Sequence, residues 1–234
     1  MFFLGTICCR GGSKGVASKN IKLLNGKPLI QYTVEEALKT PTLSDTIVST
    51  DSSEIAAIAK NCGIQKIINR PSELATDTAS KWPVFIHALE DYEKIKKVAV
   101  DYIVDMDATV PLKTSADIEA AIQTAISNPS ADVIITAYEP ERNPYFNMME
   151  INNDGFAQIV KQTSSPIVRR QDAPAVYSLC PAAYVIKKEA LYKYVHWSLA
   201  KCKLSIMPRE RAVDIDTEFD FALAEFLMNH KTNG

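Results

Sequence analysis

The stretch FFLGTICCRGGSKGVASKN, residues 2–20, organises the rest of the chain. It begins with an apolar run of strand length, residues 2–9, and a loop with three glycines within five positions follows. Glycines carry no side chain and tolerate positive φ, so consecutive backbone N–H groups are able to converge on an anion. The loop also carries three cations within ten positions, Arg10, Lys14 and Lys19, which suit a polyanion such as a triphosphate.

A glycine turn flanked by solvated charges is the alternative interpretation of this loop, because short glycine-rich matches are common. The position of the loop favours the phosphate interpretation. It follows the first predicted strand directly, and open α/β sheets bind ligands beyond the carboxyl ends of their strands.

The composition is that of an ordinary globular protein. Hydrophobic residues make up 47% of the 234 residues and charged residues 23%, and the net charge is −2. This balance favours neither nucleic acid nor an anionic membrane as partner, so any positive site is local. No apolar segment is long enough to cross a bilayer, and the N-terminus lacks the basic region of a signal peptide. The five cysteines show no metal-ligand spacing, which fits reduced thiols in a cytoplasmic protein.

Strand and helix patterns alternate over residues 1–138, and Ser115 is the expected N-cap of the fourth helix. Five strand-like segments are separated by four amphipathic helical segments, which is typical of a mostly parallel sheet covered on both faces. We therefore predict a three-layer α/β/α fold around a mostly parallel twisted sheet. The predicted strands are residues 2–9, 45–50, 66–69, 99–104 and 132–138.

Residues 139–172 differ in character from the segments on either side. Two short strand candidates, residues 146–151 and 156–161, flank an Asn-Asp-Gly turn signal. We interpret this excursion as a dimerisation arm or an active-site lid. Residues 173–234 return to the α/β core with residues 1–138, adding strands at 182–187 and 204–207. Their last element is a helix predicted to bury Phe219, Leu223 and Phe226.

Paired carboxylates occur at two places where strands are predicted to end. Asp105 and Asp107 form the first pair, and Asp214 and Asp216 form the second, just before the last helix. Extended backbone places residues i and i+2 on the same side. Mg²⁺ is normally held by one or two carboxylates together with substrate phosphates, so Asp214 and Asp216 suit a magnesium-nucleotide site. Alternatively, Asp216 is the N-cap of the helix, and the two roles are compatible.

Basic residues outside the loop are weaker signals. Arg70 follows a strand and is a candidate contact for a base or phosphate, or else a surface arginine. The guanidinium groups of Arg169 and Arg170, with Gln171 beside them, suit bidentate pairing with a carboxylate or phosphate, or else are solvated. The three histidines are scattered and indicate no local nucleophilic triad.

Taken together, the motifs resemble the acylneuraminate (CMP-sialic acid) cytidylyltransferase family. They occur in family order over nearly the whole chain, and the ordered set is far more specific than any one motif. The matching pieces are RGGSKG with Lys19-Asn20, GKPL at 26–29, STD at 49–51, RP…LATDTAS at 70–80, TVPLK at 109–113, RQDAP at 170–174 and DIDTEFD at 214–220.

This resemblance implies a nucleotide-diphospho-sugar transferase-like fold, Mg²⁺, and usually a homodimer. The reaction it implies is transfer of CMP from CTP to the anomeric hydroxyl of a nine-carbon 2-keto sugar acid, with release of pyrophosphate. Arg10, Lys14 and Asp214 are the expected catalytic residues, and Asp214 and Asp216 the expected metal ligands. The implied nucleotide-binding residues are Arg10, Gly11, Gly12, Ser13, Lys14, Lys19, Asn20, Arg70 and Ser80. The implied sugar-binding residues are Asp107, Arg170, Gln171 and Tyr184.

The chain departs from the sialic acid pattern in the expected sugar pocket. Asp107-Ala-Thr stands where those enzymes typically have Gln-Pro-Thr, and Cys180-Pro-Ala-Ala-Tyr184 stands where they often have Asn-Gly-Ala-Ile-Tyr. A carboxylate accepts hydrogen bonds only, whereas an amide also donates. The sequence looks more like the bacterial branch that activates legionaminic acid. A 3-deoxy-manno-octulosonate cytidylyltransferase and a non-catalytic nucleotide-binding protein are the alternatives.

Overall fold

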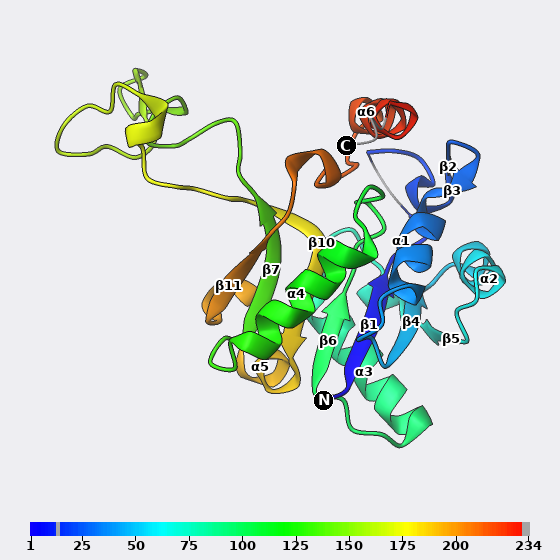
Figure 1. The fold of residues 1–234 in the computed structure, drawn as a ribbon. Coiled ribbons are helices and arrows are strands. Elements are labelled where there is room, and N and C mark those ends of the chain that lie inside the picture. Colours follow the sequence, from blue (N-terminus) through cyan, green and yellow to red (C-terminus); the bar gives the residue numbers. More distant parts are fainter. Residues whose placement is uncertain (13–14, 231–234) are drawn as a thin grey trace.

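The computed structural model describes residues 1–12 and 15–230 and has a central sheet covered by helices (Figure 1). The strands of this sheet are β1 (Phe3–Cys8), β4 (Asp45–Thr50), β5 (Lys66–Asn69), β6 (Tyr102–Asp105), β7 (Val133–Tyr138), β10 (Ser178–Lys187) and β11 (Cys202–Ile206). Their order is β11-β7-β10-β6-β1-β4-β5. Of these strands, β10 runs antiparallel to its neighbours β6 and β7, and the other pairings are parallel. The predicted mostly parallel sheet is confirmed.

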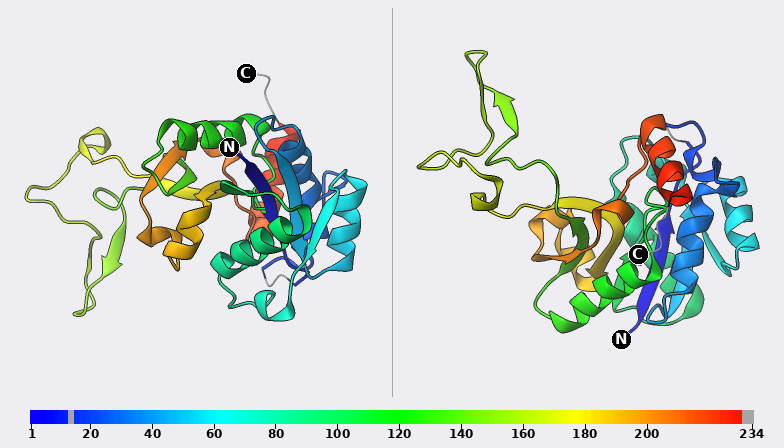
Figure 2. Two further views of the ribbon diagram at one scale, coloured as in Figure 1. Left: turned by 90° about the horizontal axis from the view of Figure 1, so that it is seen from below. Right: turned by 45° about the horizontal axis from the view of Figure 1, so that its top comes forward.

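Helices cover both faces of the sheet, as the three-layer prediction requires (Figure 2). One face is packed by α1 (Leu29–Leu38), α2 (Ser53–Asn61) and α4 (Ser115–Ser127), and the other by α3 (Lys81–Lys96) and α5 (Lys188–Lys193). The central strands are buried on both sides, which explains why β6 and β7 are continuous apolar runs in the sequence. A small ladder of β2 (Leu23–Leu24) and β3 (Lys27–Pro28) precedes α1.

Two details at helix N-termini correct the sequence analysis. The N-cap of α4 is Thr114 and not Ser115, and its backbone N–H donates to Asp117 Oδ2 at 2.9 Å. The last helix, α6 (Glu218–Asn229), is capped by Thr217, so Asp216 lies outside the cap.

The predicted buried face of α6 is wrong. Phe219 is 75% exposed and Phe226 55% exposed, whereas Phe221 and Ala224 are buried against Val16 and neighbouring apolar residues. The helix carries apolar residues on several of its faces, so their spacing alone does not determine which of them face inward.

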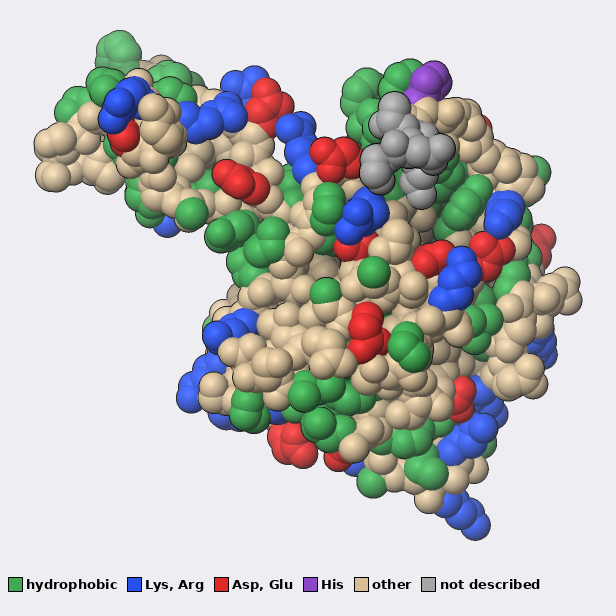
Figure 3. Space-filling view, viewed as in Figure 1, with side chains coloured by type: hydrophobic (Ala, Val, Ile, Leu, Met, Phe, Trp, Pro, Cys, Tyr) green, Lys and Arg blue, Asp and Glu red, His purple; other side chains and the backbone are tan. Residues whose placement is uncertain are grey.

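The excursion, residues 139–172, projects from the core between β7 and β10 (Figures 1 and 2). It contains an antiparallel hairpin of β8 (Met149–Ile151) and β9 (Ala157–Ile159), with the positive-φ Gly155 in the turn. Large apolar side chains are exposed on it, including Ile151 at 69% and Phe156 at 72% (Figure 3).

Candidate active site

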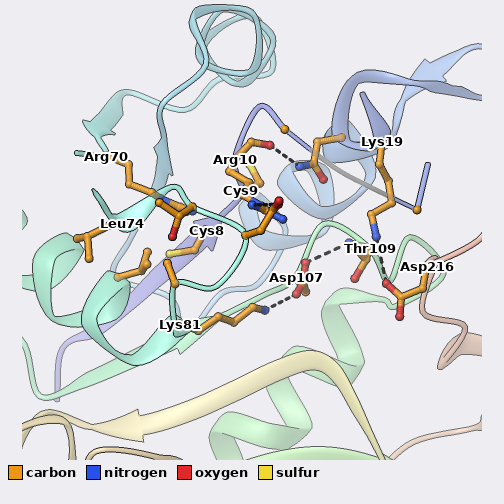
Figure 4. A pocket seen from close by; sticks show the side chains of 17 residues that line it. Cys8, Cys9, Arg10, Lys19, Arg70, Leu74, Lys81, Asp107, Thr109 and Asp216 are labelled. Carbon is orange, nitrogen blue, oxygen red and sulfur yellow. Dashed lines mark hydrogen bonds and ion pairs between the residues drawn. The ribbon is translucent and has the colours of Figure 1, made fainter. Parts of the chain in front are cut away.

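A polar cleft of ≈ 360 Å³ lies at the carboxyl ends of the parallel strands (Figure 4). Cys8 and Cys9 at the end of β1, Arg70 after β5 and Asp107 after β6 all line it. Ligands of open α/β sheets bind at this edge, because the loops that follow the parallel strands meet there. The cleft is lined by Cys8, Cys9, Arg10, Gly12, Gly15, Lys19, Asn20, Arg70, Leu74, Thr76, Asp77, Ala79, Lys81, Val84, Asp107, Thr109 and Asp216.

Two cations of the glycine-rich loop, Arg10 and Lys19, are paired with carboxylates of the cleft. Arg10 pairs with Asp77 at 2.5 Å, and its guanidinium also donates to the carbonyl of Ala75 at 3.5 Å. Lys19 pairs with Asp216 at 3.2 Å and donates to the carbonyl of Ile215 at 2.5 Å. These ion pairs hold Arg10 and Lys19 in place. The oxygens of an incoming polyanion would replace the carboxylates as partners of the two cations. The expected contacts Ser13 and Lys14 lie outside the described residues.

Gly15 is required by a close approach between two segments. A β-carbon at this position would collide with the backbone oxygen of Asp216. Neither Gly11 nor Gly12 adopts the positive φ that glycine tolerates. The N–H of Gly11 donates to Asp51 Oδ1 at 2.9 Å, which ties the loop to the end of β4.

Three expected nucleotide contacts occupy different positions around the cleft. Asn20 is buried and donates to the carbonyl of Arg10 at 3.0 Å, which fixes the base of the loop. Arg70 is 6% exposed, and its guanidinium donates to the carbonyl of Ser49 at 2.8 Å. Ser80 is the N-cap of α3 and lines a neighbouring cavity instead of the cleft.

The second carboxylate pair lies beside the loop, with Asp214 partly buried and Asp216 exposed. Asp214 Oδ1 is buried without a hydrogen-bond partner, and burial raises the pKa of this carboxyl to about 6. Asp216 lines the cleft with its side chain 75% exposed. No group of three or more His, Cys, Asp or Glu side chains gathers as a metal site within the described residues. Two carboxylates with an unsatisfied oxygen still fit Mg²⁺, because the nucleotide phosphates supply further ligands.

Asp107 is held at the floor of the cleft by two lysines. Lys81 from the start of α3 forms an ion pair with the carboxylate of Asp107 (Figure 4). The buried Lys113 donates to the backbone carbonyl of Asp107 at 2.6 Å and to that of Val110 at 2.8 Å. Although burial disfavours its charged form, the ion pair with Lys81 keeps the pKa of Asp107 below its usual value.

An aromatic cavity of ≈ 280 Å³ adjoins the polar cleft. The expected sugar contact Tyr184, on β10, lines it together with His196 and Trp197, at the start of the short helix η4 (Trp197–Leu199). Burial raises the pKa of Tyr184 to about 12, so its hydroxyl remains a neutral donor at ordinary pH. The full lining is Ser80, Lys81, Trp82, Phe85, Tyr184, His196 and Trp197.

The remaining expected sugar contacts, Arg170 and Gln171, lie outside the core of the same chain. Both occupy the short helix η3 (Arg170–Asp172) of the excursion, are exposed, and line neither the cleft nor the aromatic cavity. The ion pair beside them, Arg169 with Asp172 at 2.8 Å, is local to that turn.

Comparisons with known proteins identify the family of the chain. The family model described as cytidylyltransferase matches residues 4–228. The chain belongs to the cytidylyltransferase family. It is 40% identical over 97% of its length to "Post-translational flagellin modification protein B" of Campylobacter coli, covering 95% of that protein. It is 36% identical, with the same two coverages, to "CMP-N,N'-diacetyllegionaminic acid synthase" of Campylobacter jejuni.

Solved structures extend the likeness to the fold. The CMP:2-keto-3-deoxy-manno-octonic acid synthetase complexed with CTP superposes with a TM-score of 0.70 at 17% identity. The match covers 99% of this chain and 100% of that one. It confirms the predicted nucleotidyltransferase-type α/β/α architecture.

The cleft of this cytidylyltransferase also contains residues that sequence reasoning did not single out as site residues. Asp77 and Thr109 stand within quoted motifs, but nothing in their spacing distinguished them from their neighbours. Lys81 follows the LATDTAS motif and was missed, because its contact with Asp107 joins segments 26 residues apart. Within the described residues, no helix combines the length and apolar character needed to span a bilayer.

Proposed function

We propose that this cytidylyltransferase transfers CMP from CTP to the anomeric 2-hydroxyl of a nonulosonic acid. The hydroxyl oxygen attacks the α-phosphorus, the bond from that phosphorus to the β-phosphate oxygen breaks, and pyrophosphate leaves. The hydroxyl proton passes to solvent or to a base. Legionaminic acid is the preferred acceptor, because Asp107 replaces the amide expected in sialic acid enzymes and a relative is named for legionaminic acid.

The observation that carries this proposal is the convergence of Arg10, Lys19 and Arg70 at one sheet edge, in a cleft that Asp216 also lines. Phosphoryl transfer depends mainly on positioning and on neutralising charge. Arg10 and Lys19, with Lys14 of the same loop, hold the triphosphate. Ser13 contributes to holding the triphosphate, and Gly11 and Gly12 allow the backbone to approach the phosphates. Asn20, Arg70 and Ser80 bind the cytidine.

Mg²⁺ is the cofactor that the donor set suits. Asp214 and Asp216 would hold it, and the ion would supply Lewis-acid stabilisation of the phosphate oxygens. The buried, unpartnered Oδ1 of Asp214 supports this role, since a buried carboxylate oxygen without a donor is costly unless a cation is bound. Asp216 already contacts Lys19, so the same carboxylate keeps the loop lysine in place.

The acceptor site is assigned to the aromatic cavity and to the loop that carries Asp107. Tyr184 supplies a neutral hydroxyl, and Asp107 supplies acceptor oxygens for hydroxyl or amide groups. We further propose that the chain works as a homodimer in which the excursion of one subunit reaches the site of the other, bringing Arg170 and Gln171. The exposed apolar residues of the excursion support a subunit interface there. The cytoplasm is the proposed location, because all five cysteines are free thiols.

The decisive experiment measures pyrophosphate release with CTP, Mg²⁺ and a panel of sugar acids. The panel contains N,N'-diacetyllegionaminic acid, N-acetylneuraminate, pseudaminic acid and 3-deoxy-manno-octulosonate. Turnover of legionaminic acid with the highest kcat/KM is expected. Preference for the eight-carbon acid would support the alternative enzyme, and CTP binding without turnover of any acid would support a non-catalytic protein.

Variants connect the activity to the polar cleft. Arg10→Met removes a cation from the triphosphate position and should lower kcat by about 100-fold, a typical loss for one positioned electrostatic group. Lys27→Met is the matched control, since Lys27 is a surface lysine paired with Glu35 at 2.9 Å outside the cleft. Equal activities of the two variants would contradict the assigned role of Arg10.

A further inference from the structure

Among the described residues, Lys81 alone lines both cavities of the candidate active site. It lines both the polar cleft and the aromatic cavity, and the two linings have no other member in common. Its side chain is 46% exposed and its ammonium group pairs with Asp107. Lys81 therefore stands at the junction between the two cavities.

The chemistry of the acceptor places a negative charge at this junction. In a 2-keto sugar acid, the anomeric carbon bears both the attacking hydroxyl and the carboxylate. When the hydroxyl reaches the α-phosphorus, the carboxylate lies within a few bonds of a phosphate that is itself anionic. Two anions this close repel each other strongly unless a cation lies beside them.

Within the described residues, the other cations of the cleft are Arg10, Lys19 and Arg70, and none of them also lines the aromatic cavity. Arg10 and Lys19 belong to the loop after β1, and Arg70 is buried with its guanidinium donating to Ser49. Arg170 lies in the excursion, outside the core of its own chain. Lys81 combines partial exposure with a position that lines both the polar cleft and the aromatic cavity.

We infer that Lys81 binds the carboxylate of the acceptor sugar acid and that Asp107 positions its ammonium group for this contact. The inference rests on the proposed function and adds to it a residue that determines acceptor specificity. The backbone of Asp107 is in turn fixed by Lys113, so the ion pair presents the ammonium from a rigid support.

The test compares N,N'-diacetyllegionaminic acid with its methyl ester, which lacks the negative charge. Wild-type protein should favour the acid by about 10- to 100-fold in kcat/KM, the range expected for a hydrogen bond between charged groups. Lys81→Met should lose most of this preference and raise KM for the acid, while KM for CTP changes less than threefold. Lys81→Arg should retain part of the preference, and Lys27→Met should match wild type.

Asp107→Asn separates positioning from contact. It should raise KM for the acid and lower the preference of acid over ester only in part, because Lys81 is still present but has lost its ion-pair partner. An unchanged preference would contradict the positioning role of Asp107. Thermal unfolding of each variant identifies loss of fold. If the wild-type protein turns over the acid and Lys81→Met keeps the wild-type preference, the inference is overturned and the proposed function stands. Absence of pyrophosphate release by the wild-type protein with every acid of the panel would overturn both.

Discussion

Asp105 is a buried carboxyl group with only one of its two oxygens hydrogen-bonded. It lies at the end of β6 with 1% exposure, accepts a hydrogen bond from Thr6 Oγ1 at 2.9 Å, and has no partner at Oδ2. Burial raises its pKa to about 6, and the nearby Asp107 adds to the effect although Lys81 opposes it. The neutral acid is therefore the form that the folded protein favours at mildly acidic pH.

This raised pKa predicts how stability changes with pH. Between pH 4 and 6 the folded protein holds a proton on Asp105 that the unfolded chain releases, so this group stabilises the fold at low pH. The contribution is lost as pH rises through 6 and amounts to about 3 kcal/mol across the window. Asp105→Asn should flatten the dependence of the unfolding free energy on pH over this range, measured by urea titration. The exposed Asp154→Asn is the control, and identical slopes for both variants would contradict the assignment.

At the residue scale, the sequence identified chemistry better than it identified contacts. Arg10, Lys19 and Asp216 were predicted together because motifs and strand ends placed them at one edge, and they lie in one cleft. Lys81 was missed because its importance comes from facing Asp107 across two elements. Such a contact depends on how α3 packs against the sheet, which periodicity does not specify.

Among the helices, α6 shows how a cap and a site residue are separated by one position. Thr217 Oγ1 accepts from the N–H of Asp220 at 3.3 Å, and Asp220 Oδ2 accepts from the N–H of Thr217 at 2.8 Å and of Asp216 at 3.2 Å. The reciprocal bonds satisfy the first turn of the helix without Asp216. Its carboxylate is therefore available to Lys19 and to a cation.

Thr217→Ala tests this division of roles. Loss of the cap should lower the unfolding free energy by about 1 kcal/mol and the melting temperature by about 2–4 °C. It should also raise KM for magnesium-CTP, because the backbone that carries Asp216 loses its anchor. Thr114→Ala removes the equivalent threonine from the capping box of α4 and should lower stability alike without changing that KM. An equal rise in KM for both variants would show that the effect on KM is not specific to α6.

The elements themselves were predicted well where one face is buried, and poorly where burial is ambiguous. The spacing that placed α1, α2, α3 and α4 on the sheet is confirmed, because each has one apolar stripe facing the core. In α6 apolar residues occupy several faces, and the choice between them was made by contacts with Val16 and Leu29 from distant segments. A periodic pattern does not contain that information.

At the scale of the whole molecule, the excursion is the segment that projects away from the core (Figure 1). β7 and β10 are antiparallel neighbours, so the excursion leaves the sheet from the same edge that carries the polar cleft. It nevertheless projects away from its own cleft and exposes apolar side chains (Figures 1 and 3). An arm and a lid are both compatible with the sequence, and they place Arg170 in different active sites.

A mixture of two defective variants distinguishes the arm from the lid. Arg10→Met removes a cation of the core, and Arg170→Met removes the guanidinium of the excursion; each homodimer should be nearly inactive. If the excursion serves the other subunit, a mixed dimer contains one site with both residues intact. Co-refolding at equal amounts should then restore about a quarter of the wild-type activity, since half of the dimers are mixed and half of their sites are complete. If the excursion is a lid, every chain carries one defect at its own site and no activity returns.

Replacing Ile151 and Phe156 with Ser should abolish the recovery and yield monomers in analytical ultracentrifugation. The exposed Val195→Ser, which lies outside the excursion, should leave both the recovery and the dimer unchanged.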